Sequence, residues 1–220
     1  MAGVYRTDEC FHLAVVRSSV SVDPTEARER LVEHVDPELE ATADALRAVP
    51  RHEFVPEAWR DASYADRPIP LGEGATISAP SIVAEMCDHL ASEPSDDVLE
   101  VGTGSGYHAA VTAEIVGPEH VYTIEYDRDL AERARKRFAE LGYDEISVRV
   151  GDGRAGWPEH APYDRIYLTC AVREFPDPIC EQIREGGLVL APIGIAEQQL
   201  VLAKKTDGRL ERLDLSLIHI

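Results

Sequence analysis

The chain has 220 residues, of which 44% are hydrophobic, and 41 acidic against 22 basic side chains give it a formal net charge of −19. This length suits one domain with a sizeable core, and the composition excludes an intrinsically disordered or collagen-like chain. The longest apolar runs fall far short of the roughly 20 residues that span a bilayer, and no secretory signal pattern opens the chain, so we expect a soluble, cytoplasmic protein without a membrane partner.

The charge pattern also bears on partners and setting. Only three of the basic residues are lysines, Lys136, Lys204 and Lys205. An acidic surface with arginine favoured over lysine is typical of a halophilic cytoplasm, where salt screens the self-repulsion. Because phosphate binding needs a basic patch, we expect no nucleic-acid partner. We also expect the protein to be a monomer.

The cysteines and histidines predict no metal site. The four cysteines form no CxxC pair, and the eight histidines form no HxH or HExxH motif. In a reducing compartment the simplest interpretation of Cys87, Cys170 and Cys180 is that they are small buried apolar residues.

The N-terminal part of the chain predicts helices and a structured loop. Residues 1–22 show no period and are treated as an arm of unknown role. Asp23-Pro24 and Asp36-Pro37 each supply an N-cap followed by proline at the first helical position, and Ser78-Ala79-Pro80 opens a further helix. The prediction for residues 23–96 is a cap with helices over residues 24–34, 36–48 and 80–91 and loops over residues 49–76.

From residue 97 strands and helices alternate. This order predicts an α/β fold with a doubly wound, mostly parallel sheet and right-handed crossovers, in a single domain over residues 23–220 whose Rossmann-like core spans residues 97–214. Gly142 and Gly186-Gly187 should end helices, and Asp207-Gly208 should turn a closing antiparallel pair. The expected strands are residues 98–101, 121–124, 146–150, 165–169, 188–192, 201–203 and 210–213, and the expected helices are 107–116, 129–141 and 176–184.

A glycine-rich loop follows the first strand of this core. Glycines at 102, 104 and 106 come directly after Glu100-Val101, and such glycines let a ligand approach the backbone amides. A dinucleotide fingerprint, GxGxxG, would need glycine at position 107, where this chain has Tyr107. Glu100 would repel a pyrophosphate and attract a ligand with an amino group and a sulfonium, which favours S-adenosylmethionine over NAD.

Two acidic residues at later strand ends support this cofactor. Glu125 ends the second strand and can accept both ribose hydroxyls, while Asp152, in Gly151-Asp152-Gly153, can accept the adenine amino group. Singly, each feature has a plain alternative: a common turn, a solvated strand end or a turn former. Together, at the carboxyl edge of one sheet, they indicate a nucleoside site.

With these motifs the chain resembles the protein-L-isoaspartate O-methyltransferase family over roughly residues 24–205. The glycine loop is shared by many methyltransferases, whereas Thr76-Ile77-Ser78-Ala79-Pro80 is much more specific. The other stretches that carry the resemblance are residues 49–56, 64–66, 70–72, 151–153, 161–164, 186–187 and 192–194.

The resemblance implies a class I S-adenosylmethionine-dependent methyltransferase that starts the repair of damaged proteins. Its substrates would be isoaspartyl proteins and peptides, whose free carboxylate is methylated and then closes to a succinimide. By position Ser78 matches the active-site serine. The implied cofactor contacts are Ile77, Ser78, Ala79, Glu100, Gly102, Thr103, Gly104, Gly106, Glu125, Asp152 and Gly153, and the implied substrate contacts are Thr76, Ser81, Thr169 and Val172.

The residue set fits this chemistry. A substrate carboxylate is ionised at pH 7, so no general base is required, and alignment with the methyl group is the main task. Ser78 can offer its hydroxyl to an anion near a helix start; its alternative role is the N-cap of the helix that opens at Pro80.

Two departures leave alternatives open. The family often has histidine where this chain has Ser81, and small residues with prolines where it has Thr169 to Pro176, including Val172 and Arg173. The alternatives are a methyltransferase for RNA or a small molecule, and a non-catalytic binding module. Residues 215–220 do not resemble the family's ending, and we expect them to be a non-native tail on a truncated chain.

Overall fold

The computed structural model describes residues 23–72, 74–195 and 198–217, so the predicted N-terminal arm and the last three residues of the predicted tail lie outside it. None of the described helices is long and apolar enough to cross a membrane. The helices are α1 (Pro24–Val35), α2 (Glu40–Ala48), α3 (Pro80–Leu90), α4 (Tyr107–Val116), α5 (Arg128–Leu141) and α6 (Asp177–Gln182). The strands are β1 (Ile69–Gly72), β2 (Ala75–Ile77), β3 (Val98–Val101), β4 (Val121–Glu125), β5 (Ser147–Val150), β6 (Tyr163–Leu168), β7 (Ile183–Ile193), β8 (Gln199–Thr206) and β9 (Arg209–Leu217).

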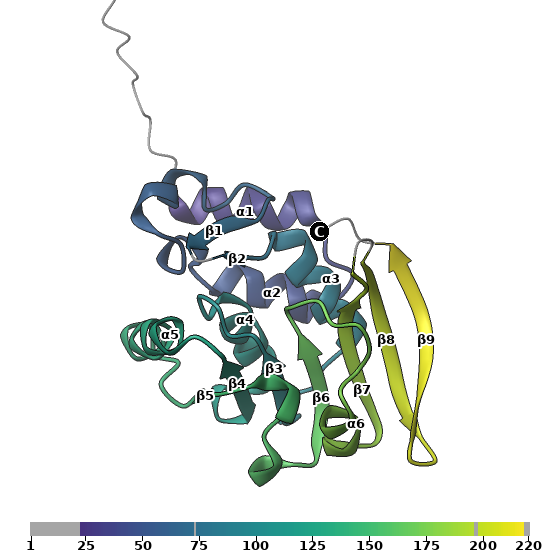
Figure 1. The fold of residues 1–220 in the computed structure, drawn as a ribbon. Coiled ribbons are helices and arrows are strands. Elements are labelled where there is room, and N and C mark those ends of the chain that lie inside the picture. Colours follow the sequence, from purple (N-terminus) through teal and green to yellow (C-terminus); the bar gives the residue numbers. More distant parts are fainter. Residues whose placement is uncertain (1–22, 73, 196–197, 218–220) are drawn as a thin grey trace, which may run out of the picture.

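A seven-stranded sheet with the order β5-β4-β3-β6-β7-β8-β9 forms the centre of the fold (Figure 1). Strands β3 to β7 run parallel, and β8 and β9 are antiparallel additions. The chain builds outward from β3 to β5 and then returns to place β6 on the other side of β3. This arrangement confirms the predicted doubly wound sheet, and its switch point lies between β3 and β6.

Alternate side chains of the parallel strands enter two separate cores. Val98 and Tyr167 belong to a larger core shared with α2, α3 and α4, whereas Leu99 and Ile166 belong to a smaller core shared with α6. This alternation follows from the period of two along a strand. Both faces of the parallel strands are therefore buried, as a sheet covered on both sides requires.

The N-terminal helices and the β1–β2 hairpin gather at one end of the sheet (Figure 1). The predicted start of the second helix is wrong: Asp36 is the left-handed C-cap of α1, with φ of 51°, and α2 begins at Glu40. The carboxylate of Asp88 in α3 instead accepts hydrogen bonds from the amides of Glu38 and Leu39. A long-range partner thus replaces the local cap that the sequence predicted.

Two connections also differ from the prediction. The 49–76 region contains two short 3₁₀ helices, Arg51–Glu53 and Glu57–Ala62, and the β1–β2 hairpin. Gly186-Gly187 does not end a helix, because α6 stops at Gln182 and Ile183 already pairs with Tyr163 in the sheet.

The closing hairpin is longer than predicted. Its turn lies at Asp207-Gly208 as expected, with φ of 50° and 74°, and the backbone of β9 pairs with β8 as far as Leu217. The first three residues of the predicted tail therefore extend this strand. Their non-native origin stays a prediction.

Candidate functional site

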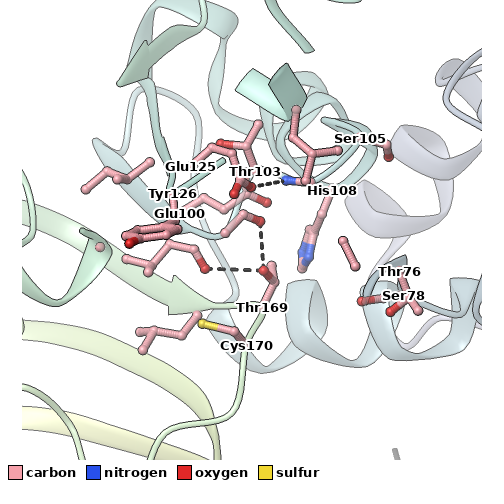
Figure 2. A pocket seen from close by; sticks show the side chains of 18 of the residues that line it. Thr76, Ser78, Glu100, Thr103, Ser105, His108, Glu125, Tyr126, Thr169 and Cys170 are labelled. Atoms are coloured by element: carbon pink, nitrogen blue, oxygen red, sulfur yellow. Dashed lines mark hydrogen bonds between the residues drawn. The ribbon is translucent and has the colours of Figure 1, made fainter. Parts of the chain in front are cut away.

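A cleft of about 650 Å³ opens where β3, β4 and β6 end, beside the β2–α3 connection (Figure 2). The structure brings most of the predicted site residues to its wall. They are Thr76, Ile77, Ser78, Glu100, Gly102, Thr103, Gly104, Glu125, Asp152, Gly153, Thr169 and Val172. Three predicted residues, Ala79, Ser81 and Gly106, are not part of the wall: the first two begin α3, and Gly106 is the N-cap of α4.

The glycine loop forms a tight cradle on one side of the cleft. Gly102 has φ of 104°, and a Cβ there would collide with the hydroxyl of Thr169. That hydroxyl donates a hydrogen bond of 2.7 Å to the Gly102 carbonyl (Figure 2), which fixes the loop against the end of β6. Only glycine lets the backbone turn this closely while its amides stay near a ligand.

Glu125 holds the same loop from β4. One carboxylate oxygen accepts a 2.8 Å hydrogen bond from the Gly104 amide, and the other accepts a 3.0 Å bond from the Asp127 amide. Because each carboxylate oxygen has two acceptor sites, Glu125 can still accept the hydroxyls of a ribose. Its 8% exposure at the cleft wall agrees with this double role.

Asp152 lies further along the wall, after β5. Its carboxylate pairs with the Arg154 guanidinium, with Nη2 2.6 Å and Nε 3.0 Å from the carboxylate oxygens. These hydrogen bonds lower the pKa of Asp152. The residue is thus ionised at neutral pH and presents an acceptor, as the adenine prediction requires.

Glu100 lies deeper than its predicted role implies. It is fully buried and accepts hydrogen bonds from the hydroxyls of Thr123, at 2.5 Å, and Tyr167, at 3.1 Å. Burial raises the pKa of Glu100 to about 8, so the neutral acid dominates at pH 7. Glu100 can therefore attract a cationic ligand only if the positive charge of the ligand lowers the pKa of Glu100 and so ionises its carboxyl group.

Ser78 faces the cleft opposite the glycine loop (Figure 2). Its alternative role as a helix cap is wrong, because the N-cap of α3 is Ala79 and no side chain there makes a cap hydrogen bond. Asp66 performs the capping from another segment, accepting a 2.9 Å hydrogen bond from the Ser81 amide. Within the part of the chain that the structure describes, the Ser78 hydroxyl makes no cap hydrogen bond and lies at the cleft wall.

The cleft also contains residues that the sequence analysis missed. Tyr126, directly after Glu125, is 82% exposed, and His108 is buried with its ring 4.3 Å from that of Tyr167. Burial lowers the pKa of His108 to about 3, so its imidazole is neutral. Cys170 was expected to be buried but is exposed at the cleft. Adjacency to Glu125 was the only available signal for Tyr126, and no local pattern marks the other two.

The described residues contain no group of three or more His, Cys, Asp or Glu side chains arranged to hold a metal ion. A glycine cradle, an acidic residue at the next strand end and a doubly wound sheet are features of nucleoside-binding α/β enzymes. Tyr107, in place of the third glycine of a dinucleotide fingerprint, favours the class I S-adenosylmethionine-dependent methyltransferases among them.

Comparison with known proteins defines the family. The model of the protein-L-isoaspartate(D-aspartate) O-methyltransferase family matches residues 28–218. A protein-L-isoaspartate O-methyltransferase of Archaeoglobus fulgidus is 49% identical over 191 residues, which cover 85% of this chain and 87% of that protein. One of Methanothermobacter thermautotrophicus is 51% identical over 172 residues, covering 77% and 79%. The chain belongs to the protein-L-isoaspartate(D-aspartate) O-methyltransferase family.

Solved structures agree with this assignment. A protein-L-isoaspartate O-methyltransferase structure superposes with a TM-score of 0.79 at 32% identity, covering 88% of this chain and 63% of that longer chain. A Plasmodium falciparum structure assigned to the same enzyme, which holds S-adenosyl-L-homocysteine, has the same fold, with a TM-score of 0.71 at 20% identity over 84% of this chain and 94% of that one. The predicted family, fold class, enzyme class and cofactor are confirmed.

Proposed function

We propose that this chain methylates the free carboxylate of L-isoaspartyl residues in damaged proteins and so initiates their repair. One observation carries the proposal beyond family membership: the Ser78 hydroxyl faces the same cleft as the glycine loop and Glu125. A carboxylate bound at Ser78 would therefore lie next to a nucleoside bound at Glu125.

Held by the glycine loop, Glu125 and Asp152, S-adenosylmethionine would supply a methyl group on a sulfonium, and the methyl would pass to a carboxylate oxygen while the electron pair of the broken carbon–sulfur bond stays on sulfur. The protein needs no base for this step, since the carboxylate is already ionised at pH 7. The neutral, buried His108 is consistent with a site that transfers no proton. The residues of the cleft instead align the two reactants and exclude water.

The proposed roles divide the wall into a cofactor side and a substrate side. On the cofactor side, Glu125 accepts hydrogen bonds from the ribose hydroxyls, and Asp152 accepts one from the adenine amino group. The amides of the glycine loop surround the rest of the cofactor. On the substrate side, Ser78 donates to the carboxylate, and Thr76, Thr169 and Val172 contact the peptide. Val172 lines the cleft, and its backbone is held in place because its amide donates a 3.0 Å hydrogen bond to the Pro192 carbonyl and its carbonyl accepts one from the Gly194 amide.

Methyl transfer to matched acceptors tests the function. We expect transfer to an isoaspartyl peptide, and none to its aspartyl twin or to RNA. Transfer to RNA would favour the nucleic-acid alternative, and peptide binding without transfer would favour a non-catalytic module. In Ser78→Ala we expect turnover to fall at least about tenfold while affinity for S-adenosylhomocysteine stays within twofold. Turnover that falls only in proportion to lost folded protein would contradict the role of Ser78.

We also propose a setting: a monomer in a high-salt cytoplasm, acting on proteins and not on nucleic acid. The net charge of −19 and the three lysines among 22 basic residues support it. Screening of this charge by salt should stabilise the folded state. The melting temperature should rise between 0.1 and 2 M KCl, while the sedimentation coefficient should stay that of a monomer.

A further inference from the structure

Arg51 is among the largest fully buried side chains of the protein, with no exposed surface. It lies in the 3₁₀ helix Arg51–Glu53, outside the wall of the cleft. Its Nε donates a 2.8 Å hydrogen bond to the Ser63 carbonyl, and its Nη2 donates a 2.8 Å bond to the Ser78 carbonyl. The guanidinium carbon lies 4.6 Å from the centre of the Tyr107 ring.

Among the described residues no carboxylate contacts this guanidinium, whose charge is met only by two carbonyl oxygens and the Tyr107 ring. Within the described part of the chain Arg51 forms no ion pair, and its Nη1 has no hydrogen-bond partner. Asp66 is close enough to favour the charge, but its carboxylate accepts from the Ser81 amide. Burial lowers the pKa of Arg51, yet an arginine stays protonated in proteins. A buried cation in this state is costly unless an anion approaches it.

The contacts of Arg51 connect the two sides of the cleft. Ser78 belongs to the substrate side, whereas Tyr107 is the first residue of α4, directly after the glycine loop, and also lines the cleft. The Ser78 carbonyl and the Ala79 amide belong to one peptide group. A charged donor on that carbonyl polarises the group and adds positive potential just behind the wall at Ser78.

We propose that Arg51 is a positioning residue for the carboxylate acceptor. It fixes the main chain at Ser78 against α4 and supplies the positive charge that favours an anion on the other side of that wall. Arg51 does not touch the substrate, and it acts through the Ser78 peptide group and through its field. This inference rests on the proposed function, because the anion is the isoaspartyl carboxylate.

Three variants test the proposal: Arg51→Met, which removes the charge; Arg51→Lys, which retains it; and Phe54→Leu, a control. Phe54 is 2% exposed and packs edge-on against Tyr107 at 5.8 Å, so its truncation loosens the same region without changing charge. We expect Arg51→Met to raise the KM for an isoaspartyl peptide by at least about tenfold, with affinity for S-adenosylhomocysteine within twofold. Arg51→Lys should recover part of this loss, and Phe54→Leu should lower Tm without raising KM.

The outcomes separate the proposal from a structural role. It is overturned if Arg51→Met raises the peptide KM no more than Phe54→Leu does, or if the cofactor affinity falls as much as the peptide affinity. If Arg51→Met does not fold, Arg51→Gln, which removes the charge and keeps a hydrogen-bond donor, decides: a raised peptide KM with unchanged cofactor affinity supports the proposal, and an unchanged KM overturns it. If the wild type transfers methyl to the peptide and the variants have the same peptide KM, only the role of Arg51 is refuted. If the wild type itself is inactive, the proposed function is refuted.

Discussion

Replacing Glu125 tests how one carboxylate serves both the loop and the cofactor. In Glu125→Ala the amides of Gly104 and Asp127 lose acceptors at 2.8 and 3.0 Å, and unsatisfied groups of this kind cost about 1–3 kcal/mol each. We therefore expect the free energy of unfolding to fall by about 2–6 kcal/mol. Loss of the ribose contact should separately weaken the binding of S-adenosylhomocysteine by about 1.5 to 3 kcal/mol, which is a rise in Kd of roughly 10- to 150-fold.

Calorimetric titration with S-adenosylhomocysteine, beside urea unfolding, measures both effects. The matched control is Asp164→Asn, because Asp164 is also a buried carboxylate that accepts from a backbone amide, that of Asp97, at the opposite end of the sheet. The control should lose stability and retain cofactor affinity. Glu125→Ala with an unchanged Kd would remove Glu125 from the cofactor site and refute the reasoning.

Two further predictions concern buried positions beneath the cleft. Burial raises the pKa of Glu100 to about 8 from 4.5, so its contribution to stability should be complete below pH 4.5 and lost as the pH rises toward 8. In Glu100→Gln, the free energy of unfolding measured in urea should decline less between pH 5 and 9. Parallel curves for the variant and the wild type would contradict this prediction. A Cβ at Gly106 would lie 2.6 Å from the Phe138 ring at φ of 89°, so Gly106→Ala should cost about 2–4 kcal/mol. Gly142→Ala, at a similar φ of 84° with open space around it, should cost only about 1 kcal/mol, and equal losses would show that the ring contact is unimportant.

The features that the sequence predicted well are local ones. The strand that ends at Val101, the glycine loop and the helix from Tyr107 form one continuous segment, and alternation of strands with helices is enough to predict a doubly wound sheet. The turn at Asp207-Gly208 is likewise specified by two adjacent residues.

The features that it missed depend on partners far along the chain. Asp88 lies 50 residues from Glu38, whose amide it binds. Because this distant residue supplies the cap, α2 does not start at the Asp36-Pro37 pair that the sequence pattern indicated. Burial raises the pKa of Glu100 even though its carboxylate accepts hydrogen bonds from Thr123 and Tyr167, which are 23 and 67 residues away. Arg51 shows the same limit, because only the fold places its side chain behind Ser78.

The most direct test is a crystal structure with S-adenosylhomocysteine and an isoaspartyl peptide bound together. We expect the ribose hydroxyls at Glu125, the adenine amino group at Asp152, and the isoaspartyl carboxylate within hydrogen-bond distance of the Ser78 hydroxyl with one oxygen directed at the sulfur. A carboxylate bound away from Ser78, or a nucleoside bound outside the cleft formed by the glycine loop and Glu125, would contradict the account.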